Sequence, residues 1–331
     1  MATLYVSEQG ALVRRVDERI VIQLEKKVLA DIPLIKIDQV VICGRIGLTT
    51  PVIQTFLEQG IEVCFLTQWG KFLGRLQPVQ GKNSLIRSDQ FRKAFDEDES
   101  TYLAKQFIHG KLRNMLNTLM RSRREGLGID ERALNQLRGI LKTLKRADSV
   151  DEVRGLEGAG SAVYFREFGK LIRKNFEFET RVRRPPTDPV NSLLSLAYTL
   201  LSKDVTSAVR VAGLDPYTGF LHKDRYGRAS LALDLMEEFR PLVADAVVLS
   251  VINRNVVDND DFVRELGGAV MLKDEARNRF FAAYEAKKQS EIRHPYFKYR
   301  ATYMRCMELQ ARLLGKYIKG ETDKYIPLVT R

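Results

Sequence analysis

The hydrophobic residues of the chain change their spacing once, near residue 80, and this change limits the fold more than any other feature. Before it, short runs of β-branched residues alternate with turn-forming residues, a pattern that predicts strands. After residue 98, apolar residues recur every three or four positions, which predicts helices as far as Ile318. A chain of 331 residues also exceeds what one core usually organises, so we expect two domains.

The first 80 residues predict a small β-rich, sandwich-like domain. Gly70 suits a hairpin between strands at 61–66 and 72–76. One helix is expected after Thr49 or Thr50, with Pro51 in its first turn and Gly60 at its end. The other predicted strands are the runs at 4–6, 11–13, 20–24 and 40–43.

Residues 81–98 are polar and end in an acidic run, so we interpret them as a linker. Residues 99–331 predict a larger all-α domain, in which Asp188-Pro189 is a typical helix entry. The expected fold class is therefore α+β, with a β-rich N-terminal domain followed by a helical C-terminal domain.

Several classes of protein are excluded by composition. The longest apolar windows, such as 246–252, stop far short of the roughly 20 residues that a membrane span needs, so no membrane association is expected. The first residues lack the basic start and apolar run of an export signal. Three cysteines, Cys43, Cys64 and Cys306, are too few and too widely spaced for a disulfide framework or a zinc site. We expect a cytoplasmic protein.

The charge of the chain points to a polyanionic partner. The 54 Lys and Arg against 42 Asp and Glu give a net charge of +12. This excess is uneven, because residues 105–184 carry 19 basic and 10 acidic residues, whereas residues 1–90 carry 11 and 9. A concentrated excess indicates a surface that follows a phosphate backbone, since each cation laid on a phosphate releases condensed counterions.

Acidic residues and one histidine form a candidate metal site. His222 ends a segment whose Asp-Pro and glycine residues predict an ordered loop. Asp234 and Glu237, three residues apart, share one face of a predicted helix, and carboxylates beside an imidazole can hold a divalent cation. Glu157 is flanked by glycines that allow close approach of other chain segments. A solvated helix face with partners such as Arg240 explains the spacing of the acids equally well.

Taken together, these segments resemble the CRISPR-associated integrase family, the first-numbered Cas protein of CRISPR adaptation. The resemblance rests on five motifs in order and extends over essentially the whole chain. The motifs are Gly155-Leu156-Glu157-Gly158 with Tyr164-Phe165, Arg183-Arg184-Pro185-Pro186-Thr187-Asp188-Pro189-Val190-Asn191, Leu196-Ala197-Tyr198, Gly213-Leu214-Asp215-Pro216 with Gly219-Phe220-Leu221-His222, and 231–241.

The resemblance implies that Glu157, His222 and an acid within 234–238 bind a catalytic Mg²⁺ or Mn²⁺. The family's two acids three residues apart fall on Asp234 and Glu237. Glu237 is the preferred ligand, although the glutamate stands where some members have aspartate, which leaves open whether Glu237 or Glu238 reaches the ion. Asp234 is then an additional ligand or a group that supports one, and Asn191 has a structural or supporting role.

The family further implies an enzyme that joins a spacer 3′-hydroxyl to a CRISPR repeat by transesterification, and that cleaves DNA when water is the nucleophile. Its expected partners are double-stranded DNA, a second copy of the chain bound through the β-rich domain, and the small second-numbered Cas protein. Candidate DNA-binding residues are Arg121, Arg123, Arg124, Arg181, Arg183 and Arg184.

Two other functions fit the same residues. A repair nuclease acting on branched DNA would use the same metal site but would not join a free 3′ end. A non-catalytic nucleic-acid scaffold would keep the acids for structural reasons only, and its DNA affinity would not depend on Glu157 or Glu237.

Overall fold

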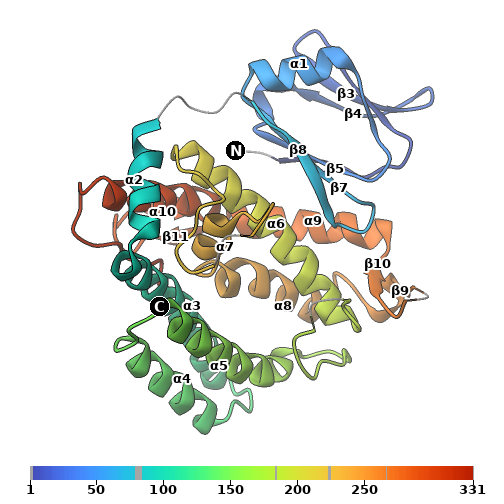
Figure 1. The fold of residues 1–331 in the computed structure, drawn as a ribbon. Coiled ribbons are helices and arrows are strands. Elements are labelled where there is room, and N and C mark those ends of the chain that lie inside the picture. The colour runs from blue at the N-terminus through green and yellow to red at the C-terminus, as the bar shows by residue number, and fades with distance from the viewer. Residues whose placement is uncertain (1–2, 79–83, 183–184, 223–224, 266, 331) are drawn as a thin grey trace.

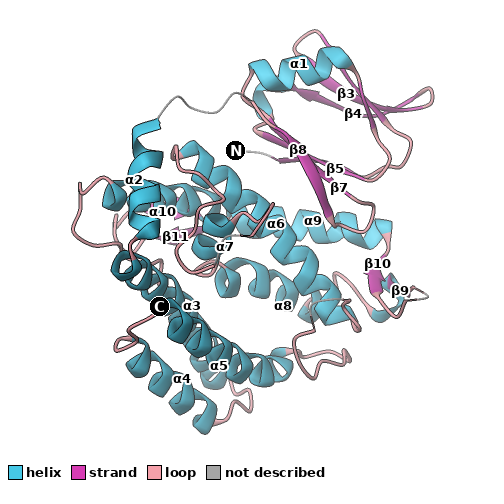
Figure 2. Cartoon of the chain, viewed as in Figure 1, coloured by secondary structure: helices cyan, strands magenta, loops and turns pink. Residues whose placement is uncertain are grey.

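The structure, a computed structural model, describes residues 3–78, 84–182, 185–222, 225–265 and 267–330. It confirms the predicted α+β class, because strands dominate up to residue 76 and helices dominate from residue 84 (Figures 1 and 2). The β-rich part forms one corner of the molecule, and the helices form the remainder.

The β-rich part contains two four-stranded sheets. One sheet has the order β1 (Thr3–Val6), β5 (Gln39–Cys43), β7 (Glu62–Leu66) and β8 (Phe72–Leu76), and its first three strands are parallel. The other has the order β4 (Lys27–Pro33), β3 (Arg19–Leu24), β2 (Leu12–Val16) and β6 (Gly47–Leu48). All the predicted strands are confirmed, as is the turn at Gly70, whose φ is +83°. Strands β4 and β6 were not predicted.

Strand β5 lies in the sheet that joins the two parts of the molecule. Val40 and Ile42 point into a core shared with α1 (Thr50–Glu58), the predicted helix. Val41 and Cys43 alternate with them and point into the core of the helical part. A strand buried on both faces shows a continuous apolar run, which is why this segment was recognisable. Cys43 and Cys64 are buried free thiols, as expected for small core residues.

The helical part is built around α6 (Pro189–Val211), which begins where Asp188 accepts a hydrogen bond from the Asn191 N–H at 2.8 Å, as Asp188-Pro189 predicted. Among the described residues, no helix has both the length and the apolar content needed to cross a bilayer. The other helices are α2 (Ser84–Phe95), α3 (Glu97–Arg124), α4 (Glu131–Leu144), α5 (Val150–Phe168), α7 (Ser230–Met236), α8 (Ala246–Asn253), α9 (Asp274–Gln289) and α10 (Tyr303–Ile318), with short 3₁₀ turns at 34–36, 169–171 and 259–261.

Two features of the C-terminal two thirds differ from the sequence-based expectation. Helix α2 lies inside the segment expected to be a linker, where Ile86 and Gln90 are buried. The helical part also contains two short β-hairpins, β9–β10 (Phe262–Arg264, Val270–Leu272) and β11–β12 (Glu291–Arg293, Arg300–Thr302), so it is not purely α. Strands of three residues are too short to show an alternating pattern, which explains why these were missed.

A π-helical turn, η3 (Arg240–Asp245), separates α7 from α8. Pro241 lies in it and has no N–H to donate, so a regular helical bond is lost there. Helical bulges of this kind occur frequently at functional sites. Glu237 lies at the C-terminal end of α7, directly before this turn.

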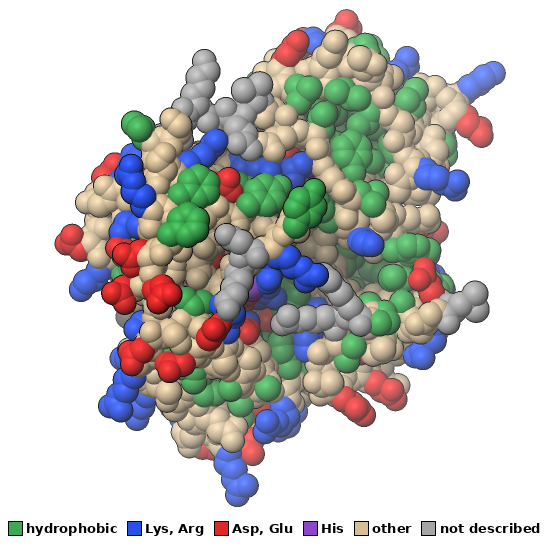
Figure 3. Space-filling model, viewed as in Figure 1, with side chains coloured by type: hydrophobic (Ala, Val, Ile, Leu, Met, Phe, Trp, Pro, Cys, Tyr) green, Lys and Arg blue, Asp and Glu red, His purple; other side chains and the backbone are tan. Residues whose placement is uncertain are grey.

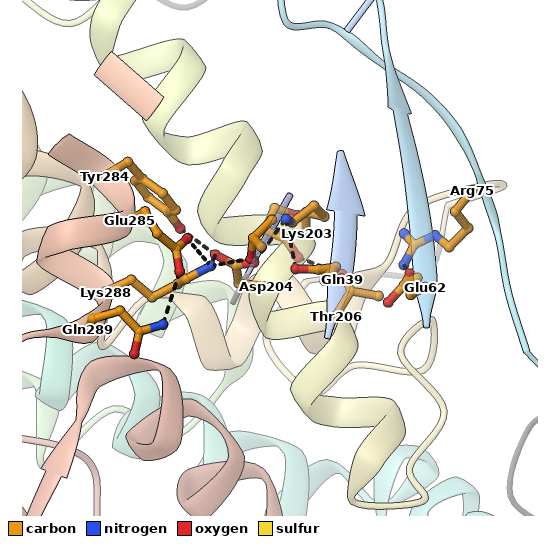
Figure 4. A network of polar contacts seen from close by, with 12 residues as sticks. Gln39, Glu62, Arg75, Lys203, Asp204, Thr206, Tyr284, Glu285, Lys288 and Gln289 are labelled. Carbon is orange, nitrogen blue, oxygen red and sulfur yellow. Dashed lines mark hydrogen bonds and ion pairs between the residues drawn. The ribbon is translucent and has the colours of Figure 1, made fainter. Parts of the chain in front are cut away.

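A buried polar network joins the first sheet to the helices (Figure 4). Lys203 on α6 donates to Gln39 of β5 at 2.9 Å and pairs with Asp204 at 3.2 Å. Asp204 also accepts from Tyr284 at 2.8 Å and lies 3.5 Å from Lys288, both on α9. These charges are almost fully buried, so each depends on its partner to offset the cost of desolvation. The network therefore fixes the sheet relative to α6 and α9.

Candidate active site

Glu157 forms an ion pair with Lys111, a residue that the sequence did not identify as part of the site. Lys111 on α3 forms ion pairs with Glu157 on α5 and, at 2.8 Å, with Oε2 of Glu237. The Lys111 side chain is only 3% exposed, so its ammonium lies in a shielded space between two carboxylates from different helices. A lysine on the apolar stripe of α3, between Ile108 and Leu112, was a sequence signal for such a buried cation.

Close packing of α3 against α5 brings these charges together. A Cβ atom at Gly160 would overlap with the Leu112 side chain as it stands, so glycine suits this separation of the helices. Gly155 and Gly158 face open space. The glycine that matters is therefore one turn beyond Glu157, rather than the two beside it.

Asp234 is the anchor of the His222 loop. It is fully buried and accepts the backbone N–H groups of Phe220, Leu221 and His222 at 2.6, 2.9 and 3.0 Å. Its Oδ1 also lies 2.6 Å from Nδ1 of His222. Gly219 makes this contact possible, because a Cβ there would lie 2.7 Å from Oδ2 of Asp234.

The ring of His222 is thus held through one nitrogen. Because Asp234 engages Nδ1, the second ring nitrogen, Nε2, is left as the available ligand. A carboxylate behind a histidine in this way fixes the tautomer and the orientation of the ring, as in many metal sites. From the opposite side, Gln90 of α2 donates to the carbonyls of Asp215 and Thr218, both at 2.8 Å, and so holds the start of the same loop.

Glu237 and Glu238 face different surroundings. Burial alone would raise the pKa of Glu237, but Arg240, Lys111 and His222 outweigh it and lower the pKa to about 2. Burial raises the pKa of Glu238 to about 7. Glu238 accepts bonds from Tyr325, Gln310 and the Leu328 N–H, on the side of the C-terminal segment.

Arg240 is a second cation beside Glu237, in addition to Lys111. Its guanidinium lies 3.1 Å from Oε1 of Glu237 and 4.8 Å from the centre of the Tyr198 ring. The Tyr198 hydroxyl donates to Asp245 at 2.6 Å, and burial raises the pKa of Asp245 to about 6. Lysine and arginine side chains gather around the hollow at the centre of the face in Figure 3, and part of a histidine is visible within it.

Asn191 holds the segment at residues 180–182 and does not contact Glu157 or Glu237. Its Oδ1 accepts from Arg181 at 2.7 Å and from the Val182 N–H at 3.0 Å, and its Nδ2 donates to the Thr180 carbonyl at 2.8 Å. The guanidinium carbon of Arg181 also lies 5.4 Å from the centre of the Tyr198 ring.

The remaining described arginines expected to bind DNA lie in the last turn of α3. Arg123 pairs with Glu131, and Arg124 donates to the Met120 carbonyl at 3.4 Å on the same helix. Arg121 lines a separate cavity, described below. Arg183 and Arg184 lie outside the described residues.

The donor groups of the site are of the types that hold a divalent cation. Within the described part of the chain, no three acidic, histidine or cysteine side chains lie close enough together to hold a metal ion. Two carboxylates nevertheless converge on one ammonium, and the His222 loop supplies an imidazole held through Nδ1. Oxygen ligands with one nitrogen suit Mg²⁺ or Mn²⁺, so the residue types fit such an ion.

A family model described as CRISPR associated protein Cas1 matches residues 4–286 of the chain. The chain belongs to the Cas1 family. This membership confirms the family that the five ordered motifs predicted, and with it the class of CRISPR-associated integrase and endonuclease.

Curated Cas1 relatives match over almost the full length. The chain is 39% identical to CRISPR-associated endonuclease Cas1 1 of Chlorobaculum tepidum over 99% of this chain and 98% of that protein. It is 39% identical to endonuclease Cas1 3 of Thermus thermophilus, over 99% and 95%. A Cas4/Cas1 fusion of Geobacter sulfurreducens is 40% identical, and the chain spans 60% of the length of that longer protein.

Solved structures share the fold at lower identity. A Cas1 protein from Thermotoga maritima superposes with a TM-score of 0.84 at 22% identity, covering all of both chains. A casposase bound to integration product superposes with a TM-score of 0.87 at 24% identity, covering 98% of this chain and 93% of that one.

Proposed function

We propose that this Cas1 chain is a metal-dependent DNA integrase and endonuclease whose Mg²⁺ or Mn²⁺ is held by Glu157, His222 and Glu237. The observation that carries the proposal is the bridging position of Lys111. Its buried ammonium supplies positive charge between carboxylates from two helices, where a bound cation would do the same. Carboxylates brought together without a cation would repel one another.

The remaining acids have supporting roles in this proposal. Asp234 is a positioning residue, since its two oxygens are already engaged by the His222 ring and three backbone N–H groups. Glu238 is not a ligand, because its oxygens are bonded on the side of Tyr325 and Leu328.

The reaction requires little covalent chemistry from the protein. In strand transfer, the 3′-hydroxyl oxygen of one DNA strand forms a bond to phosphorus, and the bond to another 3′-oxygen breaks, so the nucleophile belongs to the substrate. When bound, a divalent cation neutralises charge on the phosphate and lowers the pKa of the attacking hydroxyl. Arg240 and Lys111 add fixed positive charge beside the developing charge, and Asp234 holds the His222 ring in one orientation.

The expected partners follow from the family and from the surface. We propose double-stranded DNA as substrate and the small second-numbered Cas protein as a partner. In support, a solved complex named Cas6-RT-Cas1–Cas2 superposes with a TM-score of 0.83 at 24% identity. We further propose that residues 1–80 form a dimerisation domain, that 81–98 connect it, and that 99–331 carry catalysis in the cytoplasm.

Apolar side chains exposed on the β-rich part support the homodimer. Ile35 is 94% exposed and Val28 is 52% exposed, so both side chains are accessible to a second copy of the chain. Sedimentation at micromolar concentration tests the dimer, and a monomer there would count against it.

Strand transfer tests the activity and the site together. A labelled duplex with 3′-hydroxyl ends is incubated with a CRISPR-repeat plasmid, Mg²⁺ or Mn²⁺ and the second-numbered Cas protein. We expect the wild type and His109→Ala to join the DNA and His222→Ala to fail, because His109 lines a different cavity, with Tyr102 and Pro327.

Other results would select another function. Cleavage of branched DNA without joining, with partner and substrate intact, would indicate a repair nuclease. DNA binding with unchanged affinity and salt dependence after Glu157→Ala or Glu237→Ala, and no turnover in the wild type, would indicate a scaffold.

A further inference from the structure

A cavity of about 960 Å³ lies between α3, α8, the end of α9 and the β11–β12 hairpin. Four basic side chains line it, Arg121, Lys287, Arg293 and Lys298, and no described Asp or Glu does. We call it the hairpin cavity. Its lining comes from segments nearly 180 residues apart in sequence, so only the folded chain assembles this charge.

The cations of the hairpin cavity differ from their neighbours in sequence. Lys288 pairs with Glu285 at 2.8 Å, and Arg300 pairs with Glu291 at 3.0 Å. In the described chain, by contrast, no carboxylate lies within ion-pair distance of Lys287, Arg293 or Lys298. Lys288 of α9 and Arg300 of the hairpin are thus paired with carboxylates and do not line the cavity. The cations that line it, Lys287, Arg293 and Lys298, come from the same two elements.

Lys287 shows the effect of this arrangement. Its ammonium lies 4.4 Å from the centre of the Tyr303 ring. Burial and the nearby Arg121 lower the pKa of Lys287 to about 8. Lys287 and Arg121 thus lie at a cavity whose described lining contains no Asp or Glu, and a lining rich in cations attracts an anion.

The loop of the hairpin, whose Lys298 lines the cavity, also carries exposed aromatic side chains. Tyr296 and Tyr299 are 39% and 47% exposed, and Phe297 packs between them and His294. The backbone N–H groups of Tyr296 and Phe297 donate to Nδ1 of His294, both at 3.3 Å, which shapes the loop. Exposed rings interleaved with cations are typical of surfaces on which the bases of a single strand stack.

The hairpin cavity is close to the candidate active site but separated from it. Arg121 lies ten residues beyond Lys111 on α3, about 15 Å along the helix. Between them, the buried Asn114 donates to the carbonyls of Glu238 and Leu328 at 3.0 and 2.8 Å. These buried contacts lie between the cavity and Glu237. A DNA strand in the cavity is therefore a different one from the DNA strand at Glu237.

We propose that the hairpin cavity binds a single-stranded segment of the substrate DNA other than the end that reacts, with phosphates at Lys287 and Lys298 and bases on Tyr296 and Tyr299. This inference rests on the proposed function as a DNA-processing enzyme. A cavity of this volume admits groups the size of a small ligand, such as successive nucleotides. A double helix is excluded, since its major groove alone is about 12 Å wide.

The test measures binding of a labelled oligothymidylate of about 12 nucleotides by fluorescence anisotropy over a range of salt concentrations. Each lost phosphate contact should make the slope of log K against log salt shallower by about 0.7. We expect this change in Lys287→Gln and in Lys298→Gln, and an affinity loss of about tenfold in Tyr299→Ala. Arg300→Gln, a cation of the same hairpin that pairs with Glu291, is the matched control and should bind as the wild type does.

Several results would overturn the inference. These are an unchanged slope in both lysine variants, displacement of the oligonucleotide by an equal length of duplex as readily as by single strand, or displacement by inorganic phosphate alone. Lys298 is exposed, so Lys298→Gln keeps the test valid if Lys287→Gln fails to fold.

Glu237→Gln separates this inference from the proposed function. It should abolish joining and leave oligonucleotide binding intact. If the wild type joins DNA but the lysine variants bind normally, only the cavity assignment fails. If binding depends on the lysines but the wild type joins nothing, the proposed function fails instead.

Discussion

The ammonium nitrogen of Lys111 lies 2.8 Å from Oε2 of Glu237, and both side chains are at most 4% exposed. The same ammonium pairs with Glu157 from another helix. The buried Lys111 ammonium is thus shared by two carboxylates, and its removal leaves Glu157 without this partner and Glu237 with Arg240.

Replacement of this cation should make the protein dependent on metal for stability. In a chelating buffer, we expect Lys111→Met to lose about 3–5 kcal/mol of unfolding free energy, the usual cost of breaking a buried ion pair. Mn²⁺ should then raise the melting temperature of the variant more than that of the wild type, because the ion binds only the folded carboxylates. Thermal melts with and without Mn²⁺ measure both effects.

Lys105→Met is the matched control for this experiment. Lys105 lies on the same helix but donates to the Ala147 carbonyl at 2.9 Å. Its replacement should give no Mn²⁺-dependent difference. Equal Mn²⁺ shifts in Lys111→Met and the wild type would contradict a cation site between Glu157 and Glu237.

Asp234 offers a second test, because it acts on the site only through His222. Asp234→Asn removes the negative charge that holds Nδ1 of the ring, so we expect the Mn²⁺ concentration needed for half-maximal joining to rise about 10–100-fold. Asp215→Asn, in the same loop, should change it little, because the Asp215 carboxylate accepts from the Tyr217 and Thr218 N–H groups. An unchanged Mn²⁺ requirement in Asp234→Asn would remove Asp234 from the site.

Much of this fold could be predicted from the sequence, because the decisive patterns were local. The strands at 20–24 and 40–43 were recognisable since their side chains are buried on one or both sides of a sheet. Strand β4 was missed, because most of its residues are exposed or only half-buried and show no clear alternation. Helix α2 was missed for a similar reason, since only Ile86 and Gln90 are buried.

The candidate site was predictable as a set of residues but not as an arrangement. The spacing of Asp234 and Glu237 suggested two similar ligands. In the structure, however, Asp234 accepts hydrogen bonds from the backbone N–H groups of the His222 loop. Adjacent glutamates were indistinguishable by spacing, and their opposite surroundings depend on Tyr325, nearly 90 residues away. Contacts at such separations leave no periodic signal in the chain.

Glu238 should leave a signature in the pH dependence of stability. Burial raises its pKa to about 7, above the usual value of 4.5. Its contribution is fully present below about pH 4.5 and is lost as the pH rises through 7, because the unfolded state then releases the proton more readily. Ionisation of the buried carboxyl costs about 3 kcal/mol over this window.

We therefore expect Glu238→Gln to gain stability relative to the wild type as the pH rises from 5 to 8, whatever its absolute stability. Urea denaturation at several pH values measures the difference between the two proteins, which cancels the other titrating groups. A constant difference across this range would show that Glu238 is ionised throughout.

The packing of α3 on α5 gives the last prediction. A methyl group at Gly160 would overlap with a terminal carbon of Leu112, which is fully buried. Because the Leu112 side chain has no open space to move into, we expect Gly160→Ala to push the helices apart. Because Glu157 lies one turn from Gly160 and Lys111 is next to Leu112, this shift separates the paired charges. We expect a loss of about 1–3 kcal/mol in unfolding free energy, together with weaker Mn²⁺ binding.

Gly158→Ala is the control, since a Cβ there meets nothing within 4 Å. Alanine favours a helix interior over glycine by about 1 kcal/mol, so this variant should be at least as stable as the wild type and bind Mn²⁺ equally well. If the two substitutions change the unfolding free energy in opposite directions, metal binding depends on the distance between α3 and α5. The same sign at both positions would mean that helix propensity alone governs them, and that the close approach at Leu112 does not position Glu157.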